Sequence, residues 1–292
     1  MASNAPLVSI VTPCLNSVRF IQRTVESVLS QDYPRIEYVV MDGASTDGTT
    51  AILERYAGRI QFVSAPDKGA ADAINKGFGQ THGSLIAWLN ADDEYLPGAI
   101  RSAVQCMMEN PSACVVYGAG VWVDEYGREI GPYPTSAPYD ARMLERECGI
   151  CQPATFMRRD AVESVGWLDP ALHFTFDYDL WIRLSRRYSF VSIPERLALS
   201  RMHGQNKTLG SRKQIFQENI SLLRRHYGYV PVNWVYGYLT FLRDGRDQFF
   251  DPLHHSPTTY LTSLVCGSLY NYRHLWRYGK EWSSNLTRKK LF

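Results

Sequence analysis

The chain opens with short apolar runs that alternate with segments of helical periodicity. Four runs are apolar and short enough for buried strands: residues 7–12, 36–41, 60–64 and 85–89. Three intervening segments place apolar side chains three and four positions apart, as amphipathic helices do: residues 17–31, 49–56 and 70–78. Strands that alternate with helices in this way predict a parallel sheet covered on both faces.

The pattern changes after residue 93, where strands and helices no longer alternate regularly. Helical periodicity is found at residues 97–109, 159–165 and 178–188. Strand-like composition is found at residues 114–123, 191–193 and 197–202, and the proline-rich residues 131–139 predict a surface loop. This second part is therefore expected to be mixed α+β.

Residues 211–292 differ from the rest in composition and predict a separate helical extension. Amphipathic periodicity places helices at residues 215–226 and at about 232–242. Sixteen of these 82 residues are aromatic, and 12 Lys or Arg stand against 5 Asp or Glu. Such a segment fits peripheral contact with an anionic membrane, and a helical lid or a dimer surface explains it equally well.

Composition excludes several other classes of protein. With 45% hydrophobic and 21% charged residues, the chain has the composition of a packed globular protein. Its 31 basic and 29 acidic residues balance too closely for a nucleic-acid binder that works by bulk charge. The longest apolar tracts, residues 234–242 and 260–270, are shorter than the roughly 18 to 20 residues that span a bilayer.

Cysteine usage and the N-terminal sequence predict a cytoplasmic protein. The six cysteines lie mostly inside apolar runs, as expected for reduced thiols that pack as small hydrophobes. The first seven residues show neither the basic nor the apolar segment of a secretory signal peptide. We therefore expect a cytoplasmic location, in which the C-terminal extension would attach the protein to the inner face of the membrane.

Polar residues follow each of the first four predicted strands. In chain order they are Pro13 and Asn16, residues 42–47, Asp67 and Lys68, and residues 90–93. In an open parallel sheet, ligands bind outside the carboxyl ends of the strands. We therefore expect these residues to line one site at one edge of the sheet.

Asn90, Asp92 and Asp93 form the most acidic of these clusters. Adjacent carboxylates repel each other unless a cation neutralises them, and oxygen ligands select Mg²⁺ or Mn²⁺. Because Mg²⁺ usually takes one or two carboxylates together with substrate phosphates, such a cluster predicts a phosphorylated ligand. Acidic residues are also typical of the start of a helix, so spacing alone leaves both interpretations open.

Seven short motifs, in this order, resemble the family 2 glycosyltransferases of the A-type fold. They are residues 8–13 with Asn16, residues 42–49, residues 66–69 with Asp72 and 75–77, and residues 90–93, 152–156, 177–181 and 201–203. The resemblance covers about residues 6–208. It implies an α/β/α sandwich with a mostly parallel central sheet, in which residues 1–115 bind the nucleotide sugar and residues 116–210 bind the acceptor. The C-terminal helical extension, residues 211–292, lies outside the resemblance.

The resemblance implies metal-dependent transfer of a sugar, with inversion, from a nucleotide sugar to a hydroxyl of a glycan or lipid-linked acceptor. Asp42 would accept a hydrogen bond from the base, which leaves UDP- and GDP-linked donors both open because uracil and guanine each offer an N–H. Asp67 and Lys68 would approach the base or the phosphates. The remaining donor-site positions are Pro13, Asn16, Asn90 and Asp92.

The resemblance also implies a metal site and a catalytic base. The metal ligands would be Asp92, Asp93 and His203, with Mn²⁺ or Mg²⁺ bound. Asn90 stands where the motif often has aspartate, so this position supplies a carbonyl oxygen but no charge. The base falls on Asp177, which would remove the proton of the acceptor hydroxyl. Phe176 replaces the acidic neighbour of the motif, and an apolar neighbour tends to raise the pKa of a carboxyl group.

Two other functions would use the same features. A sugar-1-phosphate nucleotidyltransferase shares the substrate class and the architecture, but it needs a glycine-rich phosphate loop near the first strand, and residues 13–16 contain no glycine. A nucleotide-sugar sensor or an inactive partner subunit would bind the donor without transfer. It would be favoured if Asp177 or Asp93 proved dispensable.

Overall fold

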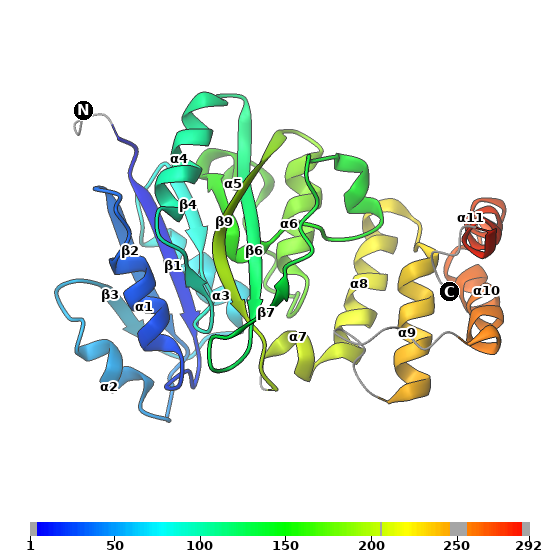
Figure 1. Ribbon diagram of the computed structural model, residues 1–292, viewed down its shortest axis with the longest axis horizontal. Coiled ribbons are helices and arrows are strands. Elements are labelled where there is room, and N and C mark those ends of the chain that lie inside the picture. The colour runs from blue at the N-terminus through cyan, green and yellow to red at the C-terminus, as the bar shows by residue number, and fades with distance from the viewer. Residues whose placement is uncertain (1–4, 205, 246–255, 288–292) are drawn as a thin grey trace. The chain divides into compact units, whose positions relative to one another are not determined.

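The computed structural model describes residues 5–204, 206–245 and 256–287 (Figure 1). The chain divides into two compact units. The first contains the chain up to Ala141 together with Cys148–Met202, and the second contains Arg142–Glu147 and the chain from His203 onward. Most of the two expected halves of the α/β domain falls in the first unit, and the expected extension, residues 211–292, falls in the second.

The first four strands form the parallel part of the sheet, as the alternating pattern predicts. They are β1 (Val8–Cys14), β2 (Ile36–Asp42), β3 (Gln61–Ser64) and β4 (Leu85–Trp88), in the spatial order β3-β2-β1-β4. In the parallel register Val8 lies beside both Ile36 and Leu85. The register brings the carboxyl ends of β1, β2 and β4 to one edge of the sheet.

The second half of the sheet is mixed rather than mostly parallel. After β4 the order continues β8 (Thr155–Arg158), β6 (Ala113–Val123), β9 (Ser189–Arg201) and β5 (Glu94–Tyr95), with β7 (Glu129–Pro132) beside β6. Strand β8 runs antiparallel to β4 and to β6, whereas β6 and β9 are parallel. The strands expected at residues 191–193 and 197–202 are one continuous strand, and β5, β7 and β8 were not expected.

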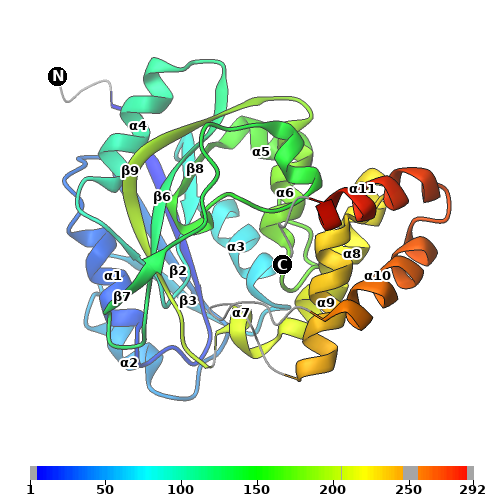
Figure 2. The same ribbon diagram turned by 45° about the vertical axis from the view of Figure 1, so that its right-hand side comes forward.

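Helices cover both faces of this nine-stranded sheet, as Figures 1 and 2 show. On one face α1 (Ile21–Leu29) and α4 (Ala99–Glu109) pack beside β5, β6 and β9. On the other, α3 (Ala70–Gly79) packs so closely on β1 that a Cβ at Gly77 would stand 2.5 Å from Val11 Cγ1. The other helices of this unit are α2 (Thr49–Glu54), α5 (Arg159–Val165) and α6 (Phe176–Ser185), with a short 3-10 turn, η3 (Gln152–Ala154).

The second unit is helical. Its elements are the 3-10 turn η2 (Ala141–Glu145), which begins one residue before the unit, and α7 (Lys207–Gly210), α8 (Arg212–Tyr227), α9 (Val232–Asp244), α10 (Pro257–Tyr270) and α11 (Leu275–Thr287). Tyrosines dominate its core, with Tyr229, Tyr236, Tyr260 and Tyr278 buried together. The helices expected at 215–226 and 232–242 are α8 and α9, whereas α10 and α11 were seen in the sequence only as an apolar tract and an aromatic, basic stretch.

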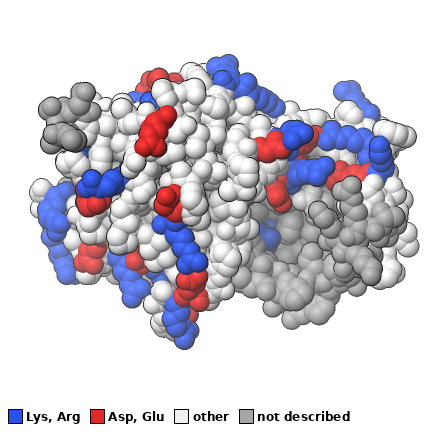
Figure 3. All heavy atoms as spheres, turned by 45° about the horizontal axis from the view of Figure 1, so that its top comes forward, with Lys and Arg blue, Asp and Glu red and all other residues white. Residues whose placement is uncertain are grey.

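On the face drawn in Figure 3, Lys and Arg side chains are interspersed with Asp and Glu among the described residues. No helix in the described part of the chain is long and apolar enough to cross a membrane.

Candidate active site

Asp42 ends β2 and lies at the carboxyl edge of the sheet, with only 2% of its surface exposed. Its carboxylate accepts hydrogen bonds from the backbone N–H of Ser45 (3.0 Å), from the hydroxyls of Ser45 and Ser64, and from the thiol of Cys14. Burial alone would raise the pKa of Asp42, but the hydrogen bonds from Ser45 and Ser64 outweigh it and hold the pKa below its ordinary value. Asp42 is therefore an ionised acceptor surrounded by small donors.

The loops after β1 and β2 are joined into one rim by side-chain-to-backbone hydrogen bonds. The backbone N–H of Asn16 donates to Ser45 Oγ at 2.7 Å, and Asn16 Oδ1 accepts from the N–H of Thr46 at 2.9 Å. Asp47 Oδ2 accepts from the N–H of Val18 at 3.0 Å. Asn16 also adopts a left-handed backbone with φ of 50°, a conformation that asparagine tolerates better than most residues. Asn16 thus orders the rim, and its side-chain oxygen is used within the protein.

Asp67 extends this rim from the loop after β3. Its Oδ1 accepts from the N–H of Gly69 at 2.7 Å. A Cβ at Gly43 would stand 2.7 Å from Asp67 Oδ2, so Asp67 lies directly against the loop that follows Asp42. The adjacent Lys68 is exposed and donates its backbone N–H to Asp72.

The two carboxylates of the acidic loop after β4 differ in their surroundings. Asp93 is buried, with Oδ1 accepting from the backbone N–H of Arg201 at 2.9 Å and Oδ2 from Asn90 Nδ2 at 3.2 Å. Burial, and then the charge of Asp92, raise the pKa of Asp93 well above its ordinary value. Asp92 is only partly buried. The structure therefore presents Asp92 as the accessible carboxylate and uses Asp93 as an internal acceptor.

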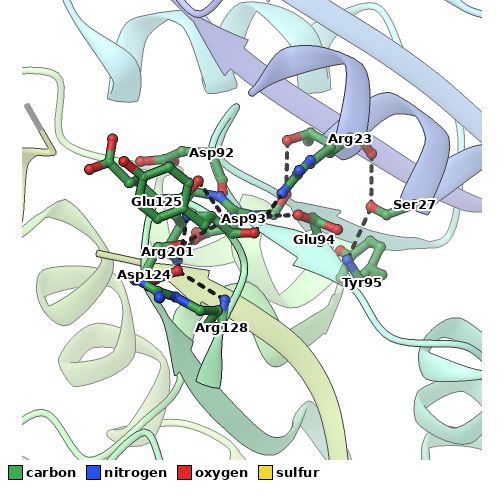
Figure 4. Close-up of polar contacts among 12 residues, drawn as sticks. Arg23, Ser27, Asp92, Asp93, Glu94, Tyr95, Asp124, Glu125, Arg128 and Arg201 are labelled. Carbon is green, nitrogen blue, oxygen red and sulfur yellow. Dashed lines mark hydrogen bonds and ion pairs between the residues drawn. The ribbon is translucent and has the colours of Figure 1, made fainter. Parts of the chain in front are cut away.

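Arg201, at the end of β9, connects the acidic loop to the rest of the sheet (Figure 4). Only 2% of its surface is exposed. Its guanidinium donates to the backbone carbonyl of Asp92 at 3.0 Å, to the carbonyl of Asp124 at 2.9 Å, and forms an ion pair with Glu94. In the sequence, this arginine is noted only within the motif at residues 201–203, beside His203. Its position at the end of an apolar strand could have indicated this role, because a charged side chain there lies at the same edge of the sheet as the acidic loop.

Asp177 is the second residue of α6, and aromatic packing brings this helix to the acidic loop. Trp88, two residues before Asn90, stacks on Trp181 of α6 with ring centroids 5.8 Å apart. The ring of Phe176 lies 6.3 Å from that of Trp88. Phe176, the departure from the motif, is therefore a packing anchor that fixes the first turn of α6 against the end of β4. Asp177 itself is partly buried, and its Oδ1 accepts from the N–H of Tyr178 at 2.8 Å.

The pKa of Tyr133 responds to both Asp177 and Asp93, so Asp177 and the acidic loop lie near the same side chain. Burial raises the pKa of Tyr133 well above its ordinary value, and Cys151, Cys148, Asp177 and Asp93 add to the rise. Both carboxylates therefore lie within electrostatic reach of the same phenol. Burial also raises the pKa of Cys151, so this thiol is a packing residue and not a reactive one.

The residues that could hold a divalent cation are those of the acidic loop. The described residues contain no group of three or more His, Cys, Asp or Glu side chains arranged around one metal position. A partly buried Asp92 carboxylate and the side-chain oxygen of Asn90 nevertheless suit Mg²⁺ or Mn²⁺, which take few protein ligands when phosphate oxygens complete the shell. His203 belongs to the second unit, where its carbonyl accepts from the N–H of Asn206 at 3.0 Å. Its part in a metal site stays a prediction.

Pro13 occupies the second-to-last position of β1 and pairs in register with Met41 of β2. Of the expected donor-site residues, Pro13, Asn16, Asp42 and Asp67 therefore come together around the ends of β1, β2 and β3. Asn90, Asp92 and Asp93 lie at the end of β4, the strand beside β1. One edge of the sheet thus carries the whole set except His203.

Comparison with known proteins identifies similar chains and folds. The model of "Glycosyl transferase family 2" matches residues 9–166. Chondroitin synthase of Escherichia coli is 29% identical over 242 residues, which are 78% of this chain and 34% of that protein. An uncharacterized glycosyltransferase of Rickettsia prowazekii is 26% identical over 217 residues, which are 70% of this chain and 66% of that protein. The chain thus spans between about a third and two thirds of the length of these relatives.

Two solved structures share the fold at low sequence identity. TarS 1-349 of S. aureus in complex with UDP-GlcNAc has a TM-score of 0.60 at 14% identity, over 90% of this chain and 81% of that one. The mannosyltransferase PcManGT of Pyrobaculum calidifontis in complex with GDP-Man and Mn²⁺ has a TM-score of 0.57 at 17% identity, over 98% of this chain and 76% of that one. These likenesses confirm the expected A-type fold.

Proposed function

Because the chain belongs to glycosyl transferase family 2 and is a glycosyltransferase, we propose that it transfers a sugar with inversion from a nucleotide sugar to an acceptor hydroxyl, with a divalent cation at the acidic loop. The observation that carries this proposal is the gathering of Asp42, Asp67, Asn90 and Asp92 at one edge of the sheet, with Asp177 held beside it by the Trp88–Trp181 stack.

The rim formed by the loops after β1, β2 and β3 is proposed to bind the nucleotide. An N–H of the base would replace one of the serine hydroxyls that now donate to Asp42. A UDP- or a GDP-linked sugar meets this requirement, and the structures of TarS with UDP-GlcNAc and of PcManGT with GDP-Man illustrate both choices in this fold. The exposed ammonium of Lys68 would approach the phosphates as a point charge.

The proposed metal ligands are the carboxylate of Asp92 and the neutral side-chain oxygen of Asn90. When bound, Mn²⁺ or Mg²⁺ would offset the negative charge that develops on the departing diphosphate. Asp93 and His203 remain proposed additional ligands, although burial favours the neutral form of Asp93. The protein's own part is to hold the loop: Arg201 fixes the carbonyl of Asp92, and Asn90 bridges Asp93 and Gln152.

Asp177 is proposed as the general base. Its carboxylate would take the proton of the acceptor hydroxyl as that oxygen forms a bond to the anomeric carbon. The bond from the anomeric carbon to the diphosphate oxygen breaks on the opposite face, so the electron pair leaves with the nucleoside diphosphate and the configuration inverts. Asp179, two residues on, is buried and paired with Arg183 at 2.7 Å, which gives it a structural role.

The proposed acceptor is a growing glycan or a lipid-linked sugar in the assembly of cell-surface polysaccharide or glycolipid. The similarity to chondroitin synthase, an enzyme named for making a polysaccharide, supports this setting. A cytoplasmic location is proposed from the cysteines, since Cys14, Cys114 and Cys151 are buried thiols and not disulfide partners. Nucleic acid is not a proposed partner.

Hydrolysis of a panel of nucleotide sugars, with and without Mn²⁺, tests the proposal most directly. We expect slow, metal-dependent release of one nucleoside diphosphate, and faster release when an acceptor is added. A chain that binds a nucleotide sugar but releases no diphosphate with any donor or acceptor would instead support a sensor or an inactive partner subunit. Formation of a nucleotide sugar from a sugar phosphate would support the nucleotidyltransferase alternative.

A further inference from the structure

Helix α10 in the second unit has one packed face and one bare face. On the packed face, Gly267 lies so close to α11 that a Cβ there would stand 1.9 Å from Tyr278 Oη. Tyr260 stacks on Trp282 of α11 with ring centroids 4.6 Å apart. The opposite face presents Leu261, Val265 and Leu269, spaced four residues apart and all exposed. A helix without charged residues therefore leaves an apolar row uncovered.

Further large apolar side chains are exposed after the end of α10 and at the start of α11. Tyr272, Leu275 and Trp276 are also exposed, so six large apolar side chains between positions 261 and 276 are each 54% to 79% exposed. We call these six residues the apolar stripe. Single exposed apolar side chains need no explanation, but six of them within residues 261–276 indicate a surface that another body covers.

Two basic side chains lie against aromatic rings of the apolar stripe, and the acids near these helices are paired. Asp244 pairs with Arg243, whose guanidinium also donates to Thr259 of α10, and Glu145 pairs with Arg277. Arg273 lies over the ring of Tyr272, with 5.4 Å between the guanidinium carbon and the ring centroid, and Lys280 Nζ lies 5.2 Å from the ring centroid of Trp276. No Asp or Glu occurs between residues 257 and 280. The next acid, Glu281, is turned inward, where it accepts hydrogen bonds from the backbone N–H of Val232 and from the hydroxyl of Tyr229.

We propose that the apolar stripe docks on the surface of an anionic lipid bilayer, with α10 lying in the plane of the interface. Tryptophan and tyrosine favour this interface because their rings are apolar and their edges are polar, and Arg273 and Lys280 would meet the lipid phosphates. The proposed contact is peripheral.

A second copy of the chain fits the stripe less well than a bilayer does. In a two-fold contact the same patch faces itself, so Arg273 and Lys280 would approach their own copies with no acid from the stripe between them. An anionic bilayer supplies the missing negative charge. Membrane docking goes beyond the proposed reaction because it requires neither donor nor acceptor, although it would hold the enzyme where lipid-linked acceptors reside.

Co-sedimentation of the full chain with vesicles tests the proposal. One set of vesicles contains phosphatidylcholine alone and the other contains phosphatidylcholine with phosphatidylglycerol, each at low and high salt. We expect binding to the anionic vesicles that weakens at high salt, because surface charge is screened. Leu269→Ser with Trp276→Ser should weaken binding about tenfold or more, since two buried apolar side chains are lost. Arg273→Gln with Lys280→Gln should weaken binding and remove most of the salt dependence.

Met108→Ser is the matched control, because Met108 is 58% exposed on α4 in the first unit. It should bind anionic vesicles as the wild type does. Thermal unfolding monitored by circular dichroism checks that the variants fold. If the apolar variant, Leu269→Ser with Trp276→Ser, fails to fold, the charge variant, Arg273→Gln with Lys280→Gln, still tests the proposal. Hydrolysis of donor in solution should be unchanged in every variant, so loss of docking is distinguished from loss of the proposed reaction.

Three results would overturn the proposal. One is wild-type protein that stays in the supernatant with anionic vesicles at low salt. Another is binding as tight as that of the wild type in both the apolar variant and the charge variant. A wild-type dimer in solution that becomes a monomer in Leu269→Ser with Trp276→Ser, without vesicle binding, would identify a second copy as the body that covers the stripe.

Discussion

The backbone N–H of Arg201 donates to Oδ1 of Asp93 across 2.9 Å, joining residues that are 108 positions apart. The same arginine holds the carbonyl oxygen of Asp92, so the end of β9 determines where the acidic loop lies. A buried guanidinium beside two adjacent carboxylates also reduces the repulsion between them. The position of Asp92 therefore depends on a strand that follows it late in the chain.

Removing Arg201 should destabilise the protein more than removing an exposed arginine of the same strand. Arg201→Met leaves Glu94 and the backbone carbonyls of Asp92 and Asp124 without their buried guanidinium partner. We expect a loss of about 3 kcal/mol or more in the free energy of unfolding. Arg196 forms an exposed pair with Glu129, so Arg196→Met should cost less than about 1 kcal/mol. Urea unfolding of both variants measures the difference, and equal losses would contradict the role given to Arg201.

Asp92→Asn should abolish the metal dependence of nucleoside diphosphate binding. The accessible carboxylate of the loop is lost, so nothing bridges the cation and the diphosphate. Calorimetric titration with UDP and GDP, in Mn²⁺ and in EDTA, should show strong binding only for the wild type in Mn²⁺. Asp32→Asn, an exposed acid paired with Arg101, is the control and should behave as the wild type. Equal wild-type affinity in Mn²⁺ and EDTA would refute the metal site.

Asp177→Asn should retain donor binding but lower transfer by about 10² to 10⁴-fold, the usual contribution of a general base. Asp160 offers a closely matched control because it also lies in the first turn of a helix, with its Oδ1 accepting from the next backbone N–H at 2.8 Å. Asp160→Asn should transfer sugar at the wild-type rate. If both variants keep wild-type turnover, Asp177 is only a helix-start acid.

Ser64→Ala should reduce stability at neutral pH and have less effect in acid. The Ser64 hydroxyl donates to Asp42 at 2.6 Å and helps to lower its pKa. A carboxyl whose pKa is lowered in the folded state stabilises the protein above its unfolded pKa of about 3.9, and this contribution is lost as the pH falls through the folded value. We expect a loss of about 1.5 kcal/mol at pH near 7 that shrinks below about pH 4. Urea unfolding across pH measures it, and a loss independent of pH would show that the hydroxyl does not act through the charge of Asp42.

The sequence by itself determined the elements whose signal is local. Apolar periodicity located β1, β2, β3 and β4 and the helices between them to within a few residues, because each pattern is set by neighbours along the chain. Polar residues after these strands identified the edge where Asp42, Asp67 and Asp92 gather, since the ends of parallel strands meet there. The motifs then identified the family.

Only the tertiary structure decided what depends on partners far away in the chain. Strand β8 is four residues long and is positioned by antiparallel pairing with β4 and β6. The local sequence pattern does not predict this pairing. Phe176 looked like a missing acid and is an anchor against Trp88. Asp92 and Asp93 are identical in type and adjacent, yet one is accessible and the other is an internal acceptor, because Arg201 and Asn90 donate to the second. Burial and long-range hydrogen bonds distinguish such residues, and the local sequence pattern predicts neither of them.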